Sequence, residues 1–237
     1  MLYHVKAHII HLEIIYRKRR SIELSLRDST DLRIVAPKGV SEKEIFQLLI
    51  KKEAWLANGI SKMKEIESQK CSFREGEALP YLGKELKIFL ESVPLSAPEA
   101  VFIREDYLWV QTHDVDQRAV QELIKAWYLT QAEQYIPQRV KKFQKLFSIE
   151  PEGVKIRGQK RRWGSCTGKN LLLFNWRLMM TPPGVLDYVV VHELCHMKEK
   201  NHQSEFWRQV AAIMPDYKIK VNWLLINGAQ CFQNFTE

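Results

Sequence analysis

A histidine-rich stretch late in the chain holds the residues whose types and spacing best suit chemistry. It reads HELCHMKEKNH and spans residues 192–202. His192 and His196 are four residues apart, so on a helix both imidazoles lie on one face and can reach a single metal ion. Glu193 flanks that face, where it can accept a proton from water bound to the same ion. The spacing predicts a two-ligand zinc clamp with its own base.

The segment before this stretch bears on whether its polar residues bind metal. Residues 185–191 read VLDYVVV and are almost wholly apolar, which indicates a buried helix. Polar side chains in a buried helix need partners, so the alternative to a metal site is a set of hydrogen-bonded core groups. Fully buried charge is rare, and we therefore favour the metal site.

A catalytic zinc needs a third protein ligand, and two residues compete for that place. On an unbroken helix Glu199 shares the face of the first two histidines, whereas His202 would lie roughly 12 Å along the axis from them. Three ligands in a line on one helix make a poor tetrahedral site. Residues 198–201 offer an end to the helix, with Asn201 able to take the left-handed conformation that turns the chain back. We favour His202 and keep Glu199 as the alternative.

The first half of the chain, which must help to position this site, reads mainly as strands. Alternating or β-branched segments between turn-forming residues predict strands at 11–16, 21–26, 32–36, 86–90, 101–103 and 108–111. A capping box at Ser41 and Glu44 opens one helix that continues to Ile66. We expect residues 1–112 to form a β-rich N-terminal part with one long helix.

Helical periods dominate from Asp114 onward. An amphipathic helix begins there, and Pro137 should kink or interrupt it. Two short strands are expected at 154–157 and 171–174, and a helix opens at Thr181 and runs through HELCHMKEKNH. The predicted fold class is α+β, with an active-site helix and a small sheet in residues 113–237. We find no internal repeat in the sequence.

The composition of the chain indicates its cellular location and whether it associates with a membrane. The chain has 237 residues, 46% of them hydrophobic, and a net charge of +8. Its four cysteines are scattered without a Cys-x-x-Cys pair, and no apolar run is long enough to span a membrane. We expect a cytoplasmic protein with no membrane partner.

Two basic clusters favour binding of a negatively charged partner. They are RKRR at 17–20 and KRR at 160–162. Such clusters attract nucleic acid, nucleotides or acidic proteins. For the first cluster we favour a structural interpretation, in which a charged turn keeps a hairpin between two strands soluble.

The order of several motifs resembles that of the YgjP-like metallopeptidase family. They are RWGSC at 162–166, NWRL at 175–178, LDYVVVHELCH at 186–196, NH at 201–202 and FW at 206–207, with weaker agreement at Pro37, Trp55 and 81–83. The chain is more distantly similar to SprT-like and WLM zinc proteases. The resemblance implies a zincin-like metallohydrolase domain over 113–237, with His192, His196 and His202 as zinc ligands. It also implies that Glu193 is the catalytic base.

These observations favour a zinc-dependent hydrolase, and above all a metallopeptidase. It would cleave peptide bonds in a peptide or protein substrate by zinc-activated water, with Glu193 as general base. One alternative is a nucleotide phosphoanhydride hydrolase (pyrophosphatase) in which Lys160, Arg161 and Arg162 bind phosphates, although a Gly-rich phosphate loop is lacking. Another is a non-catalytic zinc-containing binding module, which would have no use for Glu193.

The segment Arg162, Trp163, Gly164, Ser165 supplies candidate substrate-binding residues. The run from Trp163 to Cys166 could form an edge strand that adds backbone hydrogen bonds to an extended peptide, or only a tight turn packed on the helix. Arg162 and Tyr217 are the candidates for stabilising a developing oxyanion. Cys195 lies a quarter turn from His196 and is expected to be a small buried residue rather than a ligand.

Overall fold

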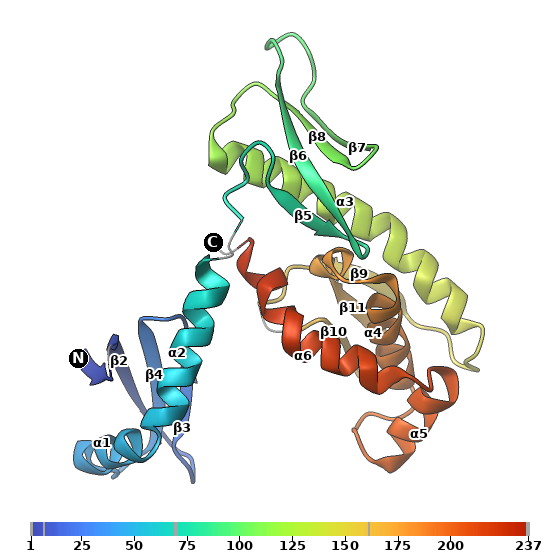
Figure 1. Ribbon diagram of the computed structural model, residues 1–237. Helices are drawn as coiled ribbons and strands as arrows, with labels where there is room; N and C mark the ends of the chain where they lie inside the picture. The colour runs from blue at the N-terminus through green and yellow to red at the C-terminus, as the bar shows by residue number, and fades with distance from the viewer. Residues whose placement is uncertain (1, 7, 69–70, 161, 236–237) are drawn as a thin grey trace. The chain divides into compact units, whose positions relative to one another are not determined.

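The structure, a computed structural model, describes residues 2–6, 8–68, 71–160 and 162–235. The chain divides into two compact units, Met1–Lys70 and Cys71–Glu237, each with its own hydrophobic core. Among the described residues the fold is mixed α/β, with six α-helices and three small mixed sheets (Figure 1).

A four-stranded sheet forms the base of the first unit. Its strands are β1 (Leu2–Val5), β2 (His8–Arg17), β3 (Glu23–Leu26) and β4 (Asp31–Pro37), in the order β1-β2-β4-β3. The central strands β2 and β4 are parallel, and each outer strand is antiparallel to its neighbour. The hairpin expected across residues 17–20 is therefore wrong, because β2 and β3 both pair with β4. The apolar strand β4 takes the central place, and the basic segment is a crossing connection.

Two helices, α1 (Glu42–Lys51) and α2 (Glu53–Ser68), complete the first unit. The predicted capping box is present, since the Glu44 amide donates to the Ser41 hydroxyl and the Ser41 amide donates to the Glu44 carboxylate. The single helix expected from Ser41 to Ile66 is broken at Lys52, which caps α1. The break lets two shorter helices supply the fully buried Ile45, Leu49, Leu56 and Ile60 to one core with β4.

The second unit begins with a sheet of β5 (Ala78–Tyr81), β6 (Lys84–Ser92), β7 (Ala100–Arg104) and β8 (Tyr107–Thr112). The strands predicted at 86–90, 101–103 and 108–111 are confirmed within it. Helix α3 (Gln117–Gln144) packs on this sheet with buried side chains such as Val120 and Ile124. Helix α3 continues through Pro137 as one helix, so of the kink or interruption expected there the interruption is wrong.

These two sheets share one topology. The order β5-β6-β8-β7 matches β1-β2-β4-β3, with a parallel central pair and antiparallel outer strands in both sheets. Each sheet is followed along the chain by helix. The structure thus has an internal repeat of topology, although none is evident in the sequence.

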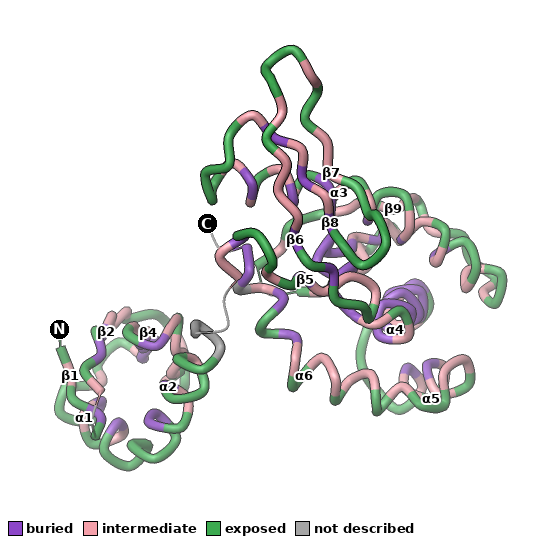
Figure 2. The backbone as a smooth tube through the Cα atoms, turned by 45° about the horizontal axis from the view of Figure 1, so that its top comes forward, coloured by how far each residue is buried: buried purple, intermediate pink, exposed green. Residues whose placement is uncertain are grey.

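A three-stranded sheet and the last helices carry the site. The sheet has the order β10-β11-β9, with β9 (Gly153–Arg157), β10 (Gly164–Cys166) and β11 (Leu171–Asn175). A 3-10 helix η1 (Trp176–Met180) then leads to α4 (Pro183–Cys195), α5 (Ser204–Ile213) and α6 (Tyr217–Gln233). Figure 2 shows α4 as mostly buried, in agreement with its apolar sequence.

The expected boundary between residues 112 and 113 falls inside the second unit, where β8 and α3 share a core. How the chain divides by function stays a prediction. Within the described residues, no helix is both long enough and apolar enough to cross a membrane.

Candidate metal centre

Three imidazoles converge beside the C-terminal end of α4. The Nε2 atom of His202 lies 3.0 Å from Nε2 of His192 and 3.0 Å from Nε2 of His196. The ligand atoms of all three residues lie within 4.8 Å of one another. Nitrogen ligands about 2.0 to 2.1 Å from a tetrahedral zinc would be separated by about 3.3 Å. The spacing of the three histidines is close to that of a zinc ligand set.

The other ring nitrogens of two of these histidines have their own partners. The Nδ1 atom of His196 lies 2.8 Å from the main-chain carbonyl oxygen of Glu199, and Nδ1 of His192 lies 3.2 Å from the Tyr188 hydroxyl. A carbonyl can only accept, so His196 carries its proton on Nδ1 and presents an Nε2 lone pair to the cluster. Burial, followed by the neighbouring His196 and His202, lowers the pKa of His192 to about 3. Neutral imidazoles facing one another suit a cation.

An early helix end brings His202 to the pair. Helix α4 ends at Cys195 with His196 as its C-cap, and the Met197 and Lys198 amides then donate to carbonyls three residues back. Asn201 is absent from the residues with positive φ, so the left-handed turn expected there is wrong. The tight turn directly after α4 redirects the chain instead. The Trp207 indole then donates to the His202 carbonyl oxygen at 3.1 Å and fixes its backbone.

Glu193 is buried next to the histidines, with 5% of its surface exposed. Its Oε2 atom has no hydrogen-bond partner among the described residues. Burial raises the pKa of Glu193 to about 8, and the charge of Arg162 opposes that shift. A Cβ atom at Gly164 would lie 2.7 Å from Oε1 of Glu193, so only glycine leaves room for this carboxylate.

The histidines and Glu193 open into a cleft of about 290 Å³. Strand β10 forms one wall of it through Gly164, Ser165 and Cys166. In the three-stranded sheet β10 is an edge strand, paired with β11 on one side only. Of the two interpretations of this segment, the structure therefore shows the edge strand. Arg162 and Lys200 also line the cleft.

A row of aromatic rings leads away from His202. Its ring stacks on Trp207 with centroids 5.7 Å apart, Trp207 stacks on Tyr217 at 5.4 Å, and Tyr217 stacks on Tyr188 at 6.5 Å. Tyr217 is thus part of the aromatic support of the site, although it is not among the described residues that line the cleft. Burial raises the pKa of Tyr188 to about 12, so its hydroxyl keeps its proton beside His192.

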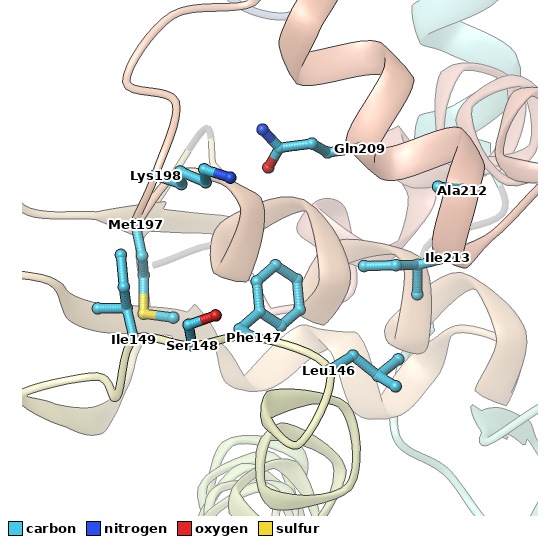
Figure 3. Close-up of a pocket in the computed structure, with 9 residues that line it drawn as sticks. All are labelled: Leu146, Phe147, Ser148, Ile149, Met197, Lys198, Gln209, Ala212 and Ile213. Carbon is cyan, nitrogen blue, oxygen red and sulfur yellow. The ribbon is translucent and has the colours of Figure 1, made fainter.

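A second, more apolar pocket lies next to the turn that follows α4. Figure 3 shows Met197 and Lys198 together with Phe147, from the loop after α3, and Ile213, from α5. This pocket has a volume of about 280 Å³ and contains none of the predicted site residues. The polar groups suited to chemistry gather in the cleft at β10.

Most of the residues singled out in the sequence come together here, and three others were missed. Cys195 is fully buried, as expected for a core residue. Arg161 lies outside the described residues. Tyr188 could have been found, because it lies one helical turn before His192. Asn175 belongs to the NWRL motif but was not singled out as a site residue, and Lys200 left no signal, because the contacts of both residues join distant segments.

Comparison with known proteins gives one family and two solved structures. The family described as YgjP-like, metallopeptidase domain, matches residues 20–227. The metallopeptidase zymogen of Pyrococcus abyssi abylysin is 19% identical, with a TM-score of 0.36 over 39% of this chain and 93% of its own. The zymogen of Methanocaldococcus jannaschii jannalysin is 22% identical, with a TM-score of 0.34 over 38% and 96%. No curated protein matches the chain.

Proposed function

The chain belongs to the YgjP-like metallopeptidase family, and from this premise we propose that it is a zinc-dependent peptidase whose centre is the three-histidine cluster. His192, His196 and His202 would hold the metal, and Glu193 would be the general base. The observation that carries the proposal is the convergence of three Nε2 atoms, with two separations of 3.0 Å. The zincin-like character of the domain is part of the same proposal.

The donor set supports zinc in particular. Imidazole is a usual zinc ligand, and catalytic zinc sites have three protein ligands and an open position. When bound, zinc would act as a Lewis acid, lower the pKa of water to about 7, and favour the ionised form of a neighbouring carboxylate. Among the described residues no fourth side chain joins the histidine cluster, which is consistent with an open position toward the cleft.

Glu193 has the placement that a general base requires. Its Oε2 atom is buried without a described protein partner, and Glu193 is one of the residues that line the cleft. Glu193 would take the proton of the attacking water and pass it to the amine that leaves when the peptide bond breaks. Close packing against Gly164 holds the carboxylate in place for both steps.

Strand β10 supports an extended peptide as the substrate. A peptide laid against its open edge would gain main-chain hydrogen bonds from a fourth strand position, independent of side-chain identity. Gly164 and Ser165 would then bind the backbone of the substrate, and Trp163 would bound one end of that strand. Arg162, which lines the cleft, and Tyr217, which belongs to the aromatic row, are the proposed donors to the developing oxyanion.

The test is a Glu193→Gln variant that is loaded with zinc alongside the native protein. Both are incubated with a mixed peptide pool, and new peptide ends are read by mass spectrometry. We expect equal zinc content and a fall in cleavage rate of about 10²- to 10⁴-fold, which is the contribution of a positioned general base. Equal cleavage by both proteins would contradict the role of Glu193, and no cleavage by the native protein would contradict a peptidase.

A further inference from the structure

The cleft has an uncompensated positive charge at each end of β10. Arg162 and Lys200 both line it, and within the part of the chain that the structure describes no carboxylate forms an ion pair with either of them. Of the described residues that line the cleft, only the buried Glu193 carries a carboxylate. We propose that the preferred substrates are peptides with acidic side chains close to the scissile bond, an inference that rests on the proposed peptidase function.

Lys200 is held at its position by neutral acceptors. Its Nζ atom donates to Oδ1 of Asn170 at 2.6 Å and to the carbonyl oxygen of Thr167 at 3.3 Å, and lies 3.7 Å from Sγ of Cys166. Thr167 and Asn170 belong to the turn that joins β10 to β11. Neutral partners orient the ammonium group without cancelling its charge, so Lys200 keeps the capacity to attract an anion.

Arg162 is held at the opposite end of the strand through its main chain. The side chain of Asn175 donates to the carbonyl oxygen of Arg162 at 2.9 Å and to that of Gln159 at 2.7 Å. Asn175 is fully buried, so this anchor is rigid.

The length of β10 fits two side chains of an extended peptide. The strand has three residues, and its two ends are about 7 Å apart at the usual rise per residue. Side chains that point to the same side of an extended peptide are separated by a similar distance. An acidic residue near each end of the bound segment would lie close to one of the two cations while its backbone pairs with β10.

The inference is tested with three peptides that differ only beside the cleaved bond. A cleavage position found in the peptide pool is rebuilt with Glu, Gln or Lys at the flanking positions, and kcat/KM is measured for each with the zinc-loaded protein. We expect the Glu peptide to be cleaved at least about tenfold faster than the Gln peptide, and the Lys peptide slowest. Added salt should shrink the difference, since it screens exposed charges.

Variants assign the preference to the two cations. Lys200→Gln should reduce kcat/KM for the Glu peptide while leaving that for the Gln peptide nearly unchanged, and Lys200→Arg should retain the preference. Arg162→Gln also removes a proposed oxyanion donor, so it should lower kcat/KM for all three peptides and, in addition, reduce the ratio between the Glu and Gln peptides. Lys169→Gln removes a charge from the same turn without touching the cleft, so it should behave as native. Calorimetry measures the affinity of the zinc-loaded Glu193→Gln protein for the Glu peptide. Adding either Arg162→Gln or Lys200→Gln to this protein should weaken that binding.

The possible failures are distinct. Equal cleavage and equal binding of the three peptides would overturn the acidic preference and leave the peptidase intact. A second outcome is that no peptide is cleaved, whereas a nucleoside triphosphate is hydrolysed in a reaction that requires Glu193. The two cations would then bind phosphate groups, and both the proposed peptidase function and the acidic preference would be wrong. If the preference persists in both charge-removing variants, other residues determine it and the assignment to Arg162 and Lys200 is wrong.

Discussion

His202 can join His192 and His196 because α4 ends at Cys195 and the chain turns at once. The alternative ligand, Glu199, instead places its main-chain carbonyl against Nδ1 of His196 at 2.8 Å. A carbonyl in that place orients the ring whose other nitrogen faces the cluster. In the proposed metal site the side chain of Glu199 would therefore have no necessary part, whereas its main-chain carbonyl would orient the ring of His196.

The choice of His202 rather than Glu199 as third ligand predicts how much zinc matched variants retain. The native protein and Glu199→Ala should each retain about one zinc per chain after dialysis, whereas His202→Ala should lose most of it, because two protein ligands bind zinc far more weakly than three. Elemental analysis of the three purified proteins measures this directly. Zinc loss in Glu199→Ala but not in His202→Ala would reverse the assignment of the third ligand.

Gly164 provides a second prediction for a single residue. In Gly164→Ala the new Cβ atom would lie 2.7 Å from Oε1 and 2.8 Å from Cγ of Glu193, so the carboxylate must move. Displacing a catalytic group by about 1 Å can cost about 100-fold in rate, and we expect a loss of that order in kcat with zinc retained.

Gly168→Ala is the matched control for Gly164→Ala. A Cβ atom at Gly168 would meet nothing within 4 Å, and the residue does not have a positive φ. Peptide cleavage by this variant should stay within about twofold of native. A similar loss in both variants would show that alanine disturbs the hairpin itself rather than the position of Glu193.

The predictable part of the site consists of residues that are close in sequence. His192, Glu193 and His196 could be placed because the helix fixes their relative positions, and His202 because a short turn limits its reach. The contact of Gly164 with Glu193 and that of Lys200 with Asn170 depend on which segments of the fold become neighbours. Local sequence spacing contains no information about such contacts.

At the scale of elements, α3 and α4 are joined by one ion pair. Arg139 on α3 donates to both carboxylate oxygens of Asp187 on α4, at 2.7 and 2.6 Å. Only 21% and 13% of these side chains are exposed. The pair fixes the long helix against α4, the helix that carries the proposed ligand His192.

Arg139→Met should therefore destabilise the second unit by about 3 kcal/mol, because it leaves a largely buried carboxylate without its partner. Urea unfolding monitored by tryptophan fluorescence measures the change. Lys125→Met is the control, since it removes an exposed pair with Glu122 on the same helix and should cost about 0.5 kcal/mol or less. Equal effects in the two variants would contradict a special role for Arg139.

The sequence predicted strands and helices better than it predicted their pairing. Alternation located β2, β6 and β8, in which buried residues recur at every second position, and the β-branched run located β4, in which Ile34, Val35 and Ala36 are all buried. Neither pattern could reveal that β2 and β4 are parallel, because that pairing depends on which strand is apolar enough for the centre of a sheet. Similarly, the helix expected to continue to Ile66 is broken at Lys52, because two helices in different directions pack on the core of the first unit. Local helix propensity does not depend on such packing and therefore could not predict the break.

At the scale of the molecule, the two units have separate cores, and this predicts separate responses to mutation. Ile34 is fully buried in the first unit. Ile34→Ala should cost that unit about 3 kcal/mol through lost burial and a cavity. Hydrogen exchange followed by mass spectrometry should show faster exchange within residues 8–68 and unchanged protection in α4, with zinc content unaffected. Loss of protection in α4 would contradict the independence of the two cores.

The second unit joins segments that are far apart along the chain. The Cys71 amide donates to the side chain of Asn234, 163 residues away, and the ring of Phe73 lies 4.9 Å from that of Phe235. Closing a loop of that length costs conformational entropy before any contact is gained, and folding slows as such contacts become more numerous. The first unit has no loop of that length to close. We therefore expect refolding in two phases, with the first unit complete early and the three proposed metal ligands brought together only in the slower phase.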